Sequence, residues 1–181
     1  ISGDETAGAA TFSCGSYSDA AGNDGTTDTT ADSGSVTIDY TVPTISSIAV
    51  TESGGSSVST GGYGNTGTYS VVVTASEALD AAPTLTVAGG SVGSGSASNS
   101  DTVWTYTFTP TDADEAVTID VAAGAITDNA GNDNTATPTQ FAFTHDATTP
   151  TLSTIAMSTN GNSGYAKSGN TITLTITASE A

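Results

Sequence analysis

The sequence predicts an all-β chain built from tandem β-sandwich modules of about 105 residues each. Short motifs recur along the 181 residues in the same order, at spacings that drift only slightly between copies. Apolar and polar residues alternate over short stretches, a pattern typical of strands with one buried face. Gly, Ser, Thr, Ala and Asp dominate, and no stretch has the spacing of a long amphipathic helix.

Three pairs of motifs define the repeat. An Asp-x-Ala-Gly-Asn-Asp turn occurs in residues 18–24 and 127–133, Asp-x-Thr-x-Pro-Thr in 39–44 and 146–151, and Thr-Ala-Ser-Glu-Ala in 74–78 and 177–181. A drift this small indicates one kind of module with loops of slightly variable length.

The repeat divides the chain into three parts. We predict the C-terminal part of an immunoglobulin-like module at residues 1–42, a complete module at 43–149 and the N-terminal part of a third at 150–181. About 100 residues are enough for one two-layer core.

In the complete module, strands are predicted wherever the alternation is clear. They cover, in chain order, residues 45–50, 69–75, 85–87, 103–108, 117–121 and 141–143, and the polar stretch 89–99 has room for one short edge strand. Pro110 ends the fourth strand because proline cannot donate to a strand ladder. Six or seven short strands, with turns every 8–12 residues or so, predict an immunoglobulin-like sandwich.

Individual side chains are expected in definite environments. Trp104, Tyr106 and Phe108 alternate along one strand and are expected to fill the core. Met157 occupies the place of a core valine, so it is expected to be buried. His145 is expected to be a half-exposed strand residue, and Cys14 a small buried one.

The charge of the chain is strongly one-sided. One Lys+Arg residue stands against 19 Asp+Glu residues, giving a net charge of −18. This excludes nucleic-acid binding, which needs Lys and Arg against phosphates. It also disfavours an anionic membrane surface, and no stretch is apolar enough to insert directly into a membrane. Divalent cations are natural partners of such a surface, and simple solvation in salty water is the alternative reason for the acidity.

The repeated motifs resemble a known family. The Asp-x-Thr-Thr-Pro-Thr string from Asp146, the Ile-Thr-Leu-Thr-Ile-Thr-Ala-Ser-Glu-Ala string from Ile172 and the Asp-x-Ala-Gly-Asn turn are similar to bacterial Ig-like repeats of giant prokaryotic cell-surface proteins. The resemblance implies a secreted, extracellular location at the cell surface. It also implies a structural role in an adhesin stalk, a surface layer (S-layer) or a filament. Some related arrays carry calcium at the joints between modules.

The strand order predicts where acidic side chains gather. In a seven-strand sandwich, the loop after the second strand and the last hairpin lie at the end where the module begins. The first joint is therefore expected to gather Asp39 from the linker, Glu77, Asp80, Asp128 and Asp133 from the module, and Asp4 and Glu5 from the preceding one. The second joint is expected to gather Asp112, Asp114, Glu115, Asp146 and Glu180.

We predict Ca²⁺ at these joints, with Asp39 and Asp146 as the principal ligands. Carboxylates packed this closely repel one another unless a cation sits among them, and calcium accepts six to eight oxygens in tolerant geometry. Zinc is not expected, since the chain has one His and one Cys far apart in sequence. The alternative is that Asp128 and its copy Asp19 only accept hydrogen bonds from backbone amides in their turns.

The predicted function is a non-catalytic structural spacer. Its expected partners are neighbouring Ig-like modules. They belong to the same chain in a stalk and to adjacent chains in a homo-polymer or lattice. Residues 89–93 fit the Gly-x-Ser-x-Gly pattern of hydrolases, but no helix is expected after them. A carbohydrate- or ligand-binding Ig-like module is the alternative, and it requires an exposed row of aromatic side chains.

Overall fold

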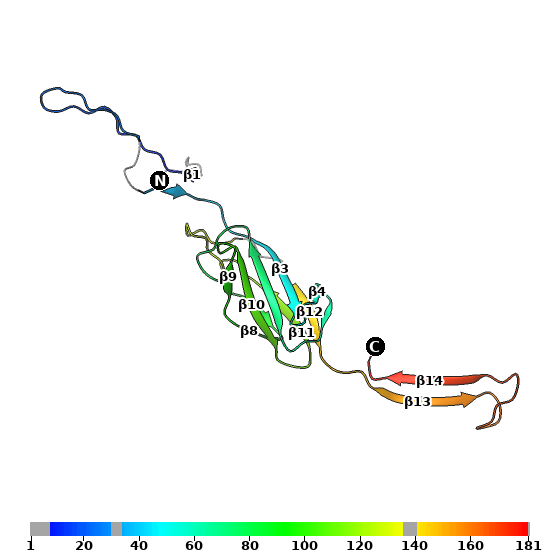
Figure 1. Cartoon of the computed structure of the whole chain (residues 1–181). Coiled ribbons are helices and arrows are strands. Elements are labelled where there is room, and N and C mark those ends of the chain that lie inside the picture. The colour runs from blue at the N-terminus through cyan, green and yellow to red at the C-terminus, as the bar shows by residue number, and fades with distance from the viewer. Residues whose placement is uncertain (1–7, 30–33, 136–140, 181) are drawn as a thin grey trace.

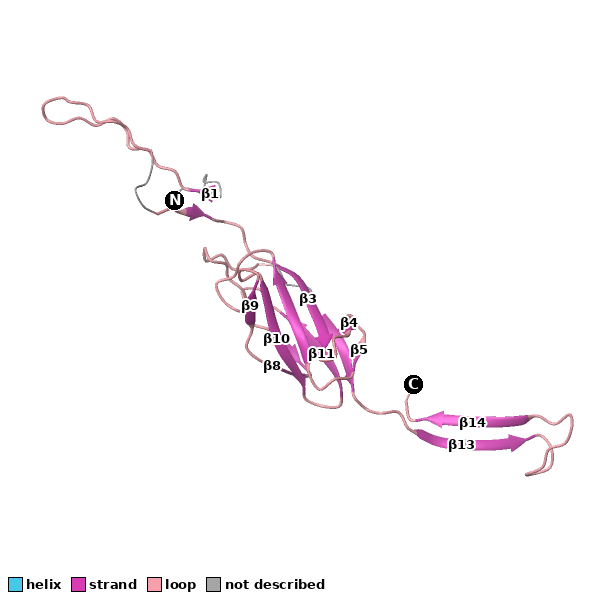
Figure 2. Cartoon of the chain, viewed as in Figure 1, coloured by secondary structure: helices cyan, strands magenta, loops and turns pink. Residues whose placement is uncertain are grey.

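The computed structural model describes residues 8–29, 34–135 and 141–180, and the described part contains strands and loops but no helix (Figures 1 and 2). Ten strands form a central sandwich. A short pair precedes it and a longer hairpin follows it, at opposite ends of the sandwich in Figure 1. The prediction of an all-β, immunoglobulin-like fold is confirmed.

The central sandwich consists of two sheets. The order in the first is β4 (Ser57–Val58), β3 (Ile45–Glu52), β6 (Tyr69–Ala75), β10 (Val103–Pro110) and β8 (Gly90–Val92), with β9 (Ser96–Ser98) also paired to β10. The order in the second is β5 (Tyr63–Gly64), β12 (Phe141–Asp146), β11 (Asp114–Asp120) and β7 (Thr86–Ala88).

The alternating sequence of the strands builds the core. The expected inward residues of β10, Trp104, Tyr106 and Phe108, are buried. The ring of Tyr69 on β6 lies 5.0 Å from the ring of Phe143 on β12, so aromatic side chains join the two sheets.

The chain changes sheets between β7 and β8 at Gly89. This residue has a φ of +76°, and a Cβ there would lie 2.6 Å from the carbonyl oxygen of Ala116. Only glycine suits both the backbone conformation and the close approach of β11.

The stretch 89–99 contains two short strands, β8 and β9, where the sequence allowed one, and two further strands of the sandwich lie outside every predicted strand. β4 and β5 lie in the Ser/Gly-rich stretch that was expected to be a loop. Val58 pairs with Val50 and is buried, while β5 runs parallel to β12. Two-residue strands have no periodicity to detect, so only tertiary packing defines them.

The flanking segments form strands without a core. β1 (Gly8–Ala9) pairs with β2 (Thr37–Ile38), and β13 (Leu152–Thr159) pairs with β14 (Ile172–Ala178). The predictions that Cys14 and Met157 are buried are wrong: Cys14 is exposed and Met157 is 74% exposed. No second sheet covers either segment within the described residues.

The prediction for His145 is also wrong. The imidazole is only 3% exposed, and its Nδ1 lies 2.7 Å from the hydroxyl oxygen of Tyr69, which is within hydrogen-bonding distance. Its position on β12 faces the interior, where Tyr69 supplies the partner that a buried polar group needs.

Candidate metal centre

The Asp128 turn forms one side of an acidic cluster at the end where the sandwich begins. Oδ1 of Asp128 accepts hydrogen bonds from the amides of Ala130 and Asn132, both at 2.8 Å, and Oδ2 accepts one from Asn132 Nδ2 at 2.8 Å. Burial acts to raise the pKa of this carboxyl, but the hydrogen bonds from Asn132, Ala130 and Gly131 outweigh it and hold the pKa below its ordinary value. Asp128 is therefore a buried, ionised carboxylate.

The linker lies across this turn. Nδ2 of Asn132 also approaches the backbone carbonyl of Asp39 at 3.2 Å, and Oδ1 of Asp39 accepts a hydrogen bond from the Thr41 amide at 2.9 Å. Further along the linker, the Thr44 amide donates to Ser76 Oγ and the Ser76 amide donates back to the Thr44 carbonyl. The linker is thus fastened to both the last hairpin and the loop after β6.

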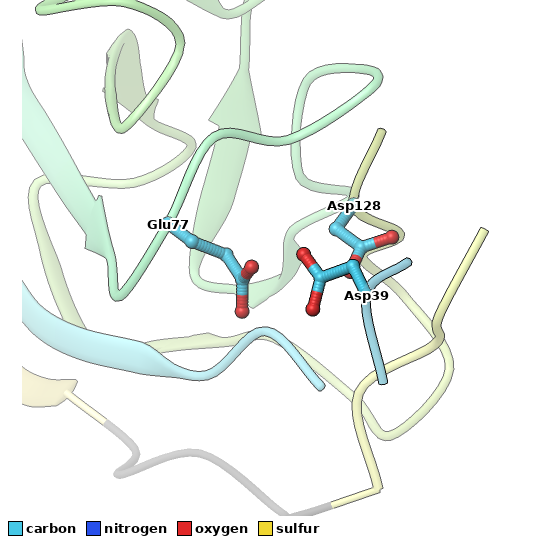
Figure 3. A group of neighbouring side chains, drawn as sticks. All are labelled: Asp39, Glu77 and Asp128. Carbon is cyan, nitrogen blue, oxygen red and sulfur yellow. The ribbon is translucent and has the colours of Figure 1, made fainter. Parts of the chain in front are cut away.

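Glu77, in that loop, completes the cluster. An isolated bridge between Leu79 and Asp128 holds the loop against the hairpin. One oxygen from each of Asp39, Glu77 and Asp128 lies within 4.8 Å of the others. Figure 3 shows these three side chains together. Burial, and then the charges of Asp39 and Asp128, raise the pKa of Glu77. Oε1 of Glu77 is buried without a hydrogen-bond partner.

The chemistry of this donor set suits a hard divalent cation. The three carboxylates supply oxygen only, which calcium prefers, and backbone carbonyls and water are the usual remaining ligands. No His or Cys belongs to the group, so zinc is not favoured. A cation here would also neutralise the repulsion among three carboxylates and give Glu77 Oε1 a partner.

The structure brings together only part of the predicted first joint. Asp39, Glu77 and Asp128 meet, whereas Asp80 and Asp133 do not join them. Asp133 accepts a hydrogen bond from the Thr127 hydroxyl at 2.7 Å, and the Asp80 amide donates to the Thr127 carbonyl. Asp4 and Glu5 lie outside the described residues.

The second joint is also only partly as predicted. Asp146 and Glu180 line one hollow, and Glu52 at the end of β3 joins them, a residue that the sequence reasoning missed. Oε1 of Glu180, like that of Glu77, is buried without a hydrogen-bond partner. Glu52 is the last residue of β3, the first strand of the module. Its position at the end of the predicted first strand was the signal that could have placed it at the second joint.

Asp114 lies directly opposite Asp146 in the β11–β12 pair, so the structure brings these two predicted residues together, whereas Asp112 and Glu115 serve the turn before β11. Asp114 accepts a hydrogen bond from the Thr148 hydroxyl at 2.5 Å, which lowers the pKa of the Asp114 carboxyl. Glu115 Oε1 accepts the amides of Thr111 and Asp112 and so closes the turn before β11.

The fold and the cluster define a β-sandwich module with an acidic joint at its entry. The bacterial Ig-like domain family matches residues 39–145, more than half of the chain, and the chain therefore belongs to this family. The match begins at the linker residue Asp39 and includes Glu77 and Asp128. Curated proteins and solved structures give no match.

Membership of this family indicates a structural or surface module. Bacterial Ig-like domains are generally non-catalytic and are commonly extracellular. Within the described residues, no helix has the length and apolar character needed to cross a bilayer.

Proposed function

We propose that this chain is a non-catalytic spacer segment of a long extracellular prokaryotic surface protein, with Ca²⁺ stiffening the joints between Ig-like modules. The observation that carries the proposal is the meeting of Asp39, Glu77 and Asp128. One ligand comes from the linker and two come from the following module, so an ion bound there ties the linker to the module.

The electrostatics of the cluster support a cation. At an effective dielectric constant near 20, two unit charges about 5 Å apart repel by on the order of 3 kcal/mol. Lys167, the only Lys or Arg residue, lies in the loop between β13 and β14 and not in this cluster. A divalent cation would convert this repulsion into attraction and restrict the linker.

The sheet edges favour a stalk over a lateral lattice. The outermost strands β4, β5, β7 and β8 have only two or three residues each. Short edge strands offer few free backbone groups for pairing with another chain. Modules of this kind therefore suit contacts with chain neighbours at their two ends, as in an adhesin stalk.

The alternative of a carbohydrate-binding module has less support. It requires a row of exposed aromatic side chains, and Trp104, Tyr106 and Phe108 are buried in the core. The exposed aromatic side chains among the described residues do not occupy alternate positions of one strand, so they do not make a stacking platform. They are Phe12, Tyr17, Tyr40, Tyr63 and Tyr165.

Thermal unfolding of the full chain, with Ca²⁺ and with a chelator, tests the proposal. At a calcium concentration 100 times the Kd, binding adds about 2.7 kcal/mol, which corresponds to roughly 10 °C in Tm for a domain of this size. E77Q should remove most of this shift, and the matched control D80N, in the same loop but outside the cluster, should retain it. Small-angle scattering should show a longer particle with calcium. An unchanged Tm and an unchanged length would refute the role of calcium.

A further inference from the structure

The turn between β9 and β10 has an unusual backbone conformation. The φ angles of Asn99, Ser100 and Asp101 are +52°, +54° and +60°, and no other residue of the described part except glycine has a positive φ. These angles lie in the left-handed region, which is unfavourable for residues with a Cβ and is usually visited at single positions. Three such residues in succession persist only where the surrounding structure holds them.

Hydrogen bonds within the turn hold this conformation. Nδ2 of Asn99 donates to Oγ1 of Thr102 at 3.0 Å, and the Thr102 hydroxyl donates to the Asn99 carbonyl at 2.8 Å. The turn presents the Asp101 carbonyl to two further donors, the Leu79 amide and the Trp104 indole Nε1, both at 3.1 Å. One carbonyl oxygen has two lone pairs and accepts both bonds. The turn therefore joins β10 to the loop that follows β6.

That loop carries Glu77, and the turn is one of its anchors. On one side of Glu77, the Ser76 amide donates to the linker, and on the other side the Leu79 amide donates to the Asp101 carbonyl. Leu79 is only 2% exposed and forms the isolated bridge with Asp128. A displacement of the turn would therefore move Leu79, and with it two of the three carboxylates of the cluster.

We propose that Asp101 is a positioning residue of the cation site, which holds the Glu77 loop in place through its backbone carbonyl. The inference rests on the proposed calcium site, where Asp101 acts through Leu79 and not as a ligand. A carboxylate that is already held in its bound position loses less freedom when the ion arrives. The left-handed turn thus increases the affinity of the site for calcium.

The same contacts couple the site to the core. Coupling between two positions is reciprocal, so an ion that restricts Glu77 and Asp128 also restricts Leu79 and the hydrogen bond that its amide donates. The Trp104 indole shares the acceptor of that bond, and its own hydrogen bond should change when the ion binds. Trp104 is therefore expected to report on the occupancy of the site.

The T102V variant tests the turn. Valine keeps the branched shape of threonine but loses the hydroxyl that bonds to Asn99, so the left-handed conformation is no longer held. Calorimetric titration should show calcium binding weakened at least about tenfold, as is typical when a group that orients a metal ligand is removed. The matched control S98A, in the same hairpin, removes a hydroxyl whose hydrogen bond to the Val103 carbonyl is long, at 3.4 Å, and should change the affinity less than about twofold. Equal affinities in T102V and S98A would overturn the proposal.

Nuclear magnetic resonance provides a second test that leaves the turn unchanged. Trp104 is the only tryptophan of the chain, so its indole N–H gives a single resonance. We expect Ca²⁺ to shift this resonance and that of the Leu79 amide with the midpoint of the calorimetric titration, and E77Q to abolish the shifts and the binding together. Calcium binding that leaves the Trp104 or the Leu79 resonance unshifted would overturn the role of Asp101 and leave the proposed function intact. An absence of calcium binding would overturn both.

Discussion

The Asp19 and Asp128 turns have the same local structure and different surroundings. In each, the aspartate accepts hydrogen bonds from the amides two and four residues later and from the side chain of the same asparagine, at 2.7–2.9 Å. Asp19 is exposed, whereas Asp128 is 3% exposed and meets Asp39 and Glu77.

The comparison separates two roles of one motif. The turn forms wherever its sequence occurs, because its hydrogen bonds are local. The cation site needs a linker and a second loop as well, and these reach Asp128 only through the fold. The hypothesis that the aspartate serves the turn and the hypothesis that it serves an ion are therefore compatible.

The largest expected effect comes from deleting the aspartate in each turn. D128A should lower the free energy of unfolding of the sandwich by about 1 kcal/mol in chelator, because the partly buried donors of Ala130 and Asn132 lose their acceptor. D19A should leave it unchanged, since Asp19 lies outside the sandwich. Urea denaturation followed by Trp104 fluorescence measures both. Equal losses of unfolding free energy in D128A and D19A would contradict a difference in structural role between the two turns.

The asparagine of each turn sharpens the comparison. Nδ2 of Asn132 reaches the Asp39 carbonyl as well as Asp128, whereas Asn23 reaches Asp19. N132A should destabilise the sandwich by less than about 1 kcal/mol and loosen the linker, and N23A should do neither. Hydrogen exchange of the Thr41 amide reports on the linker. Unchanged exchange in N132A would contradict this coupling.

The smallest expected effect concerns pH. The pKa of Glu77 is raised in the folded chain, so in chelator its contribution to stability is greatest below the ordinary glutamate pKa and is lost as pH rises through the folded value. Stability should therefore contain a component that increases from pH 7 toward pH 5 and is absent in E77Q. With calcium, the same change in pH should weaken stability, because protons compete with the ion. A Tm–pH profile that is identical for both proteins in chelator would argue against Glu77 as its source.

Local sequence patterns were sufficient to predict the main strands and the acidic end of the module. Alternation located β6, β10 and β14, and the repeated motifs placed Asp39, Glu77 and Asp128 at one end of the module. Burial was harder to predict, because it depends on an opposing sheet. Met157 has the pattern of a core residue and is exposed, and His145 is buried because Tyr69 accommodates it.

The members of the site depended on similar tertiary details. Asp133 follows Asp128 at the same spacing as Asp24 follows Asp19 in the other turn. Asp133 nevertheless accepts a hydrogen bond from the Thr127 hydroxyl and does not join the cluster. Glu52 lies in the second-joint hollow because of where β3 ends, which motif matching does not reveal. Side-chain direction within a loop is set by hydrogen-bond partners that are distant in sequence.

Calorimetric titration of the full chain with Ca²⁺, before and after D39N, is the direct test of calcium binding by Asp39, Glu77 and Asp128. Asp39 lies in the linker, outside the two sheets, so the substitution leaves the sandwich intact while removing one ligand charge. We expect saturable binding to the unmodified chain and an affinity at least tenfold lower in D39N, equivalent to about 1.4 kcal/mol. Equal affinities for the two proteins, or no heat of binding to either, would contradict calcium binding by these three residues.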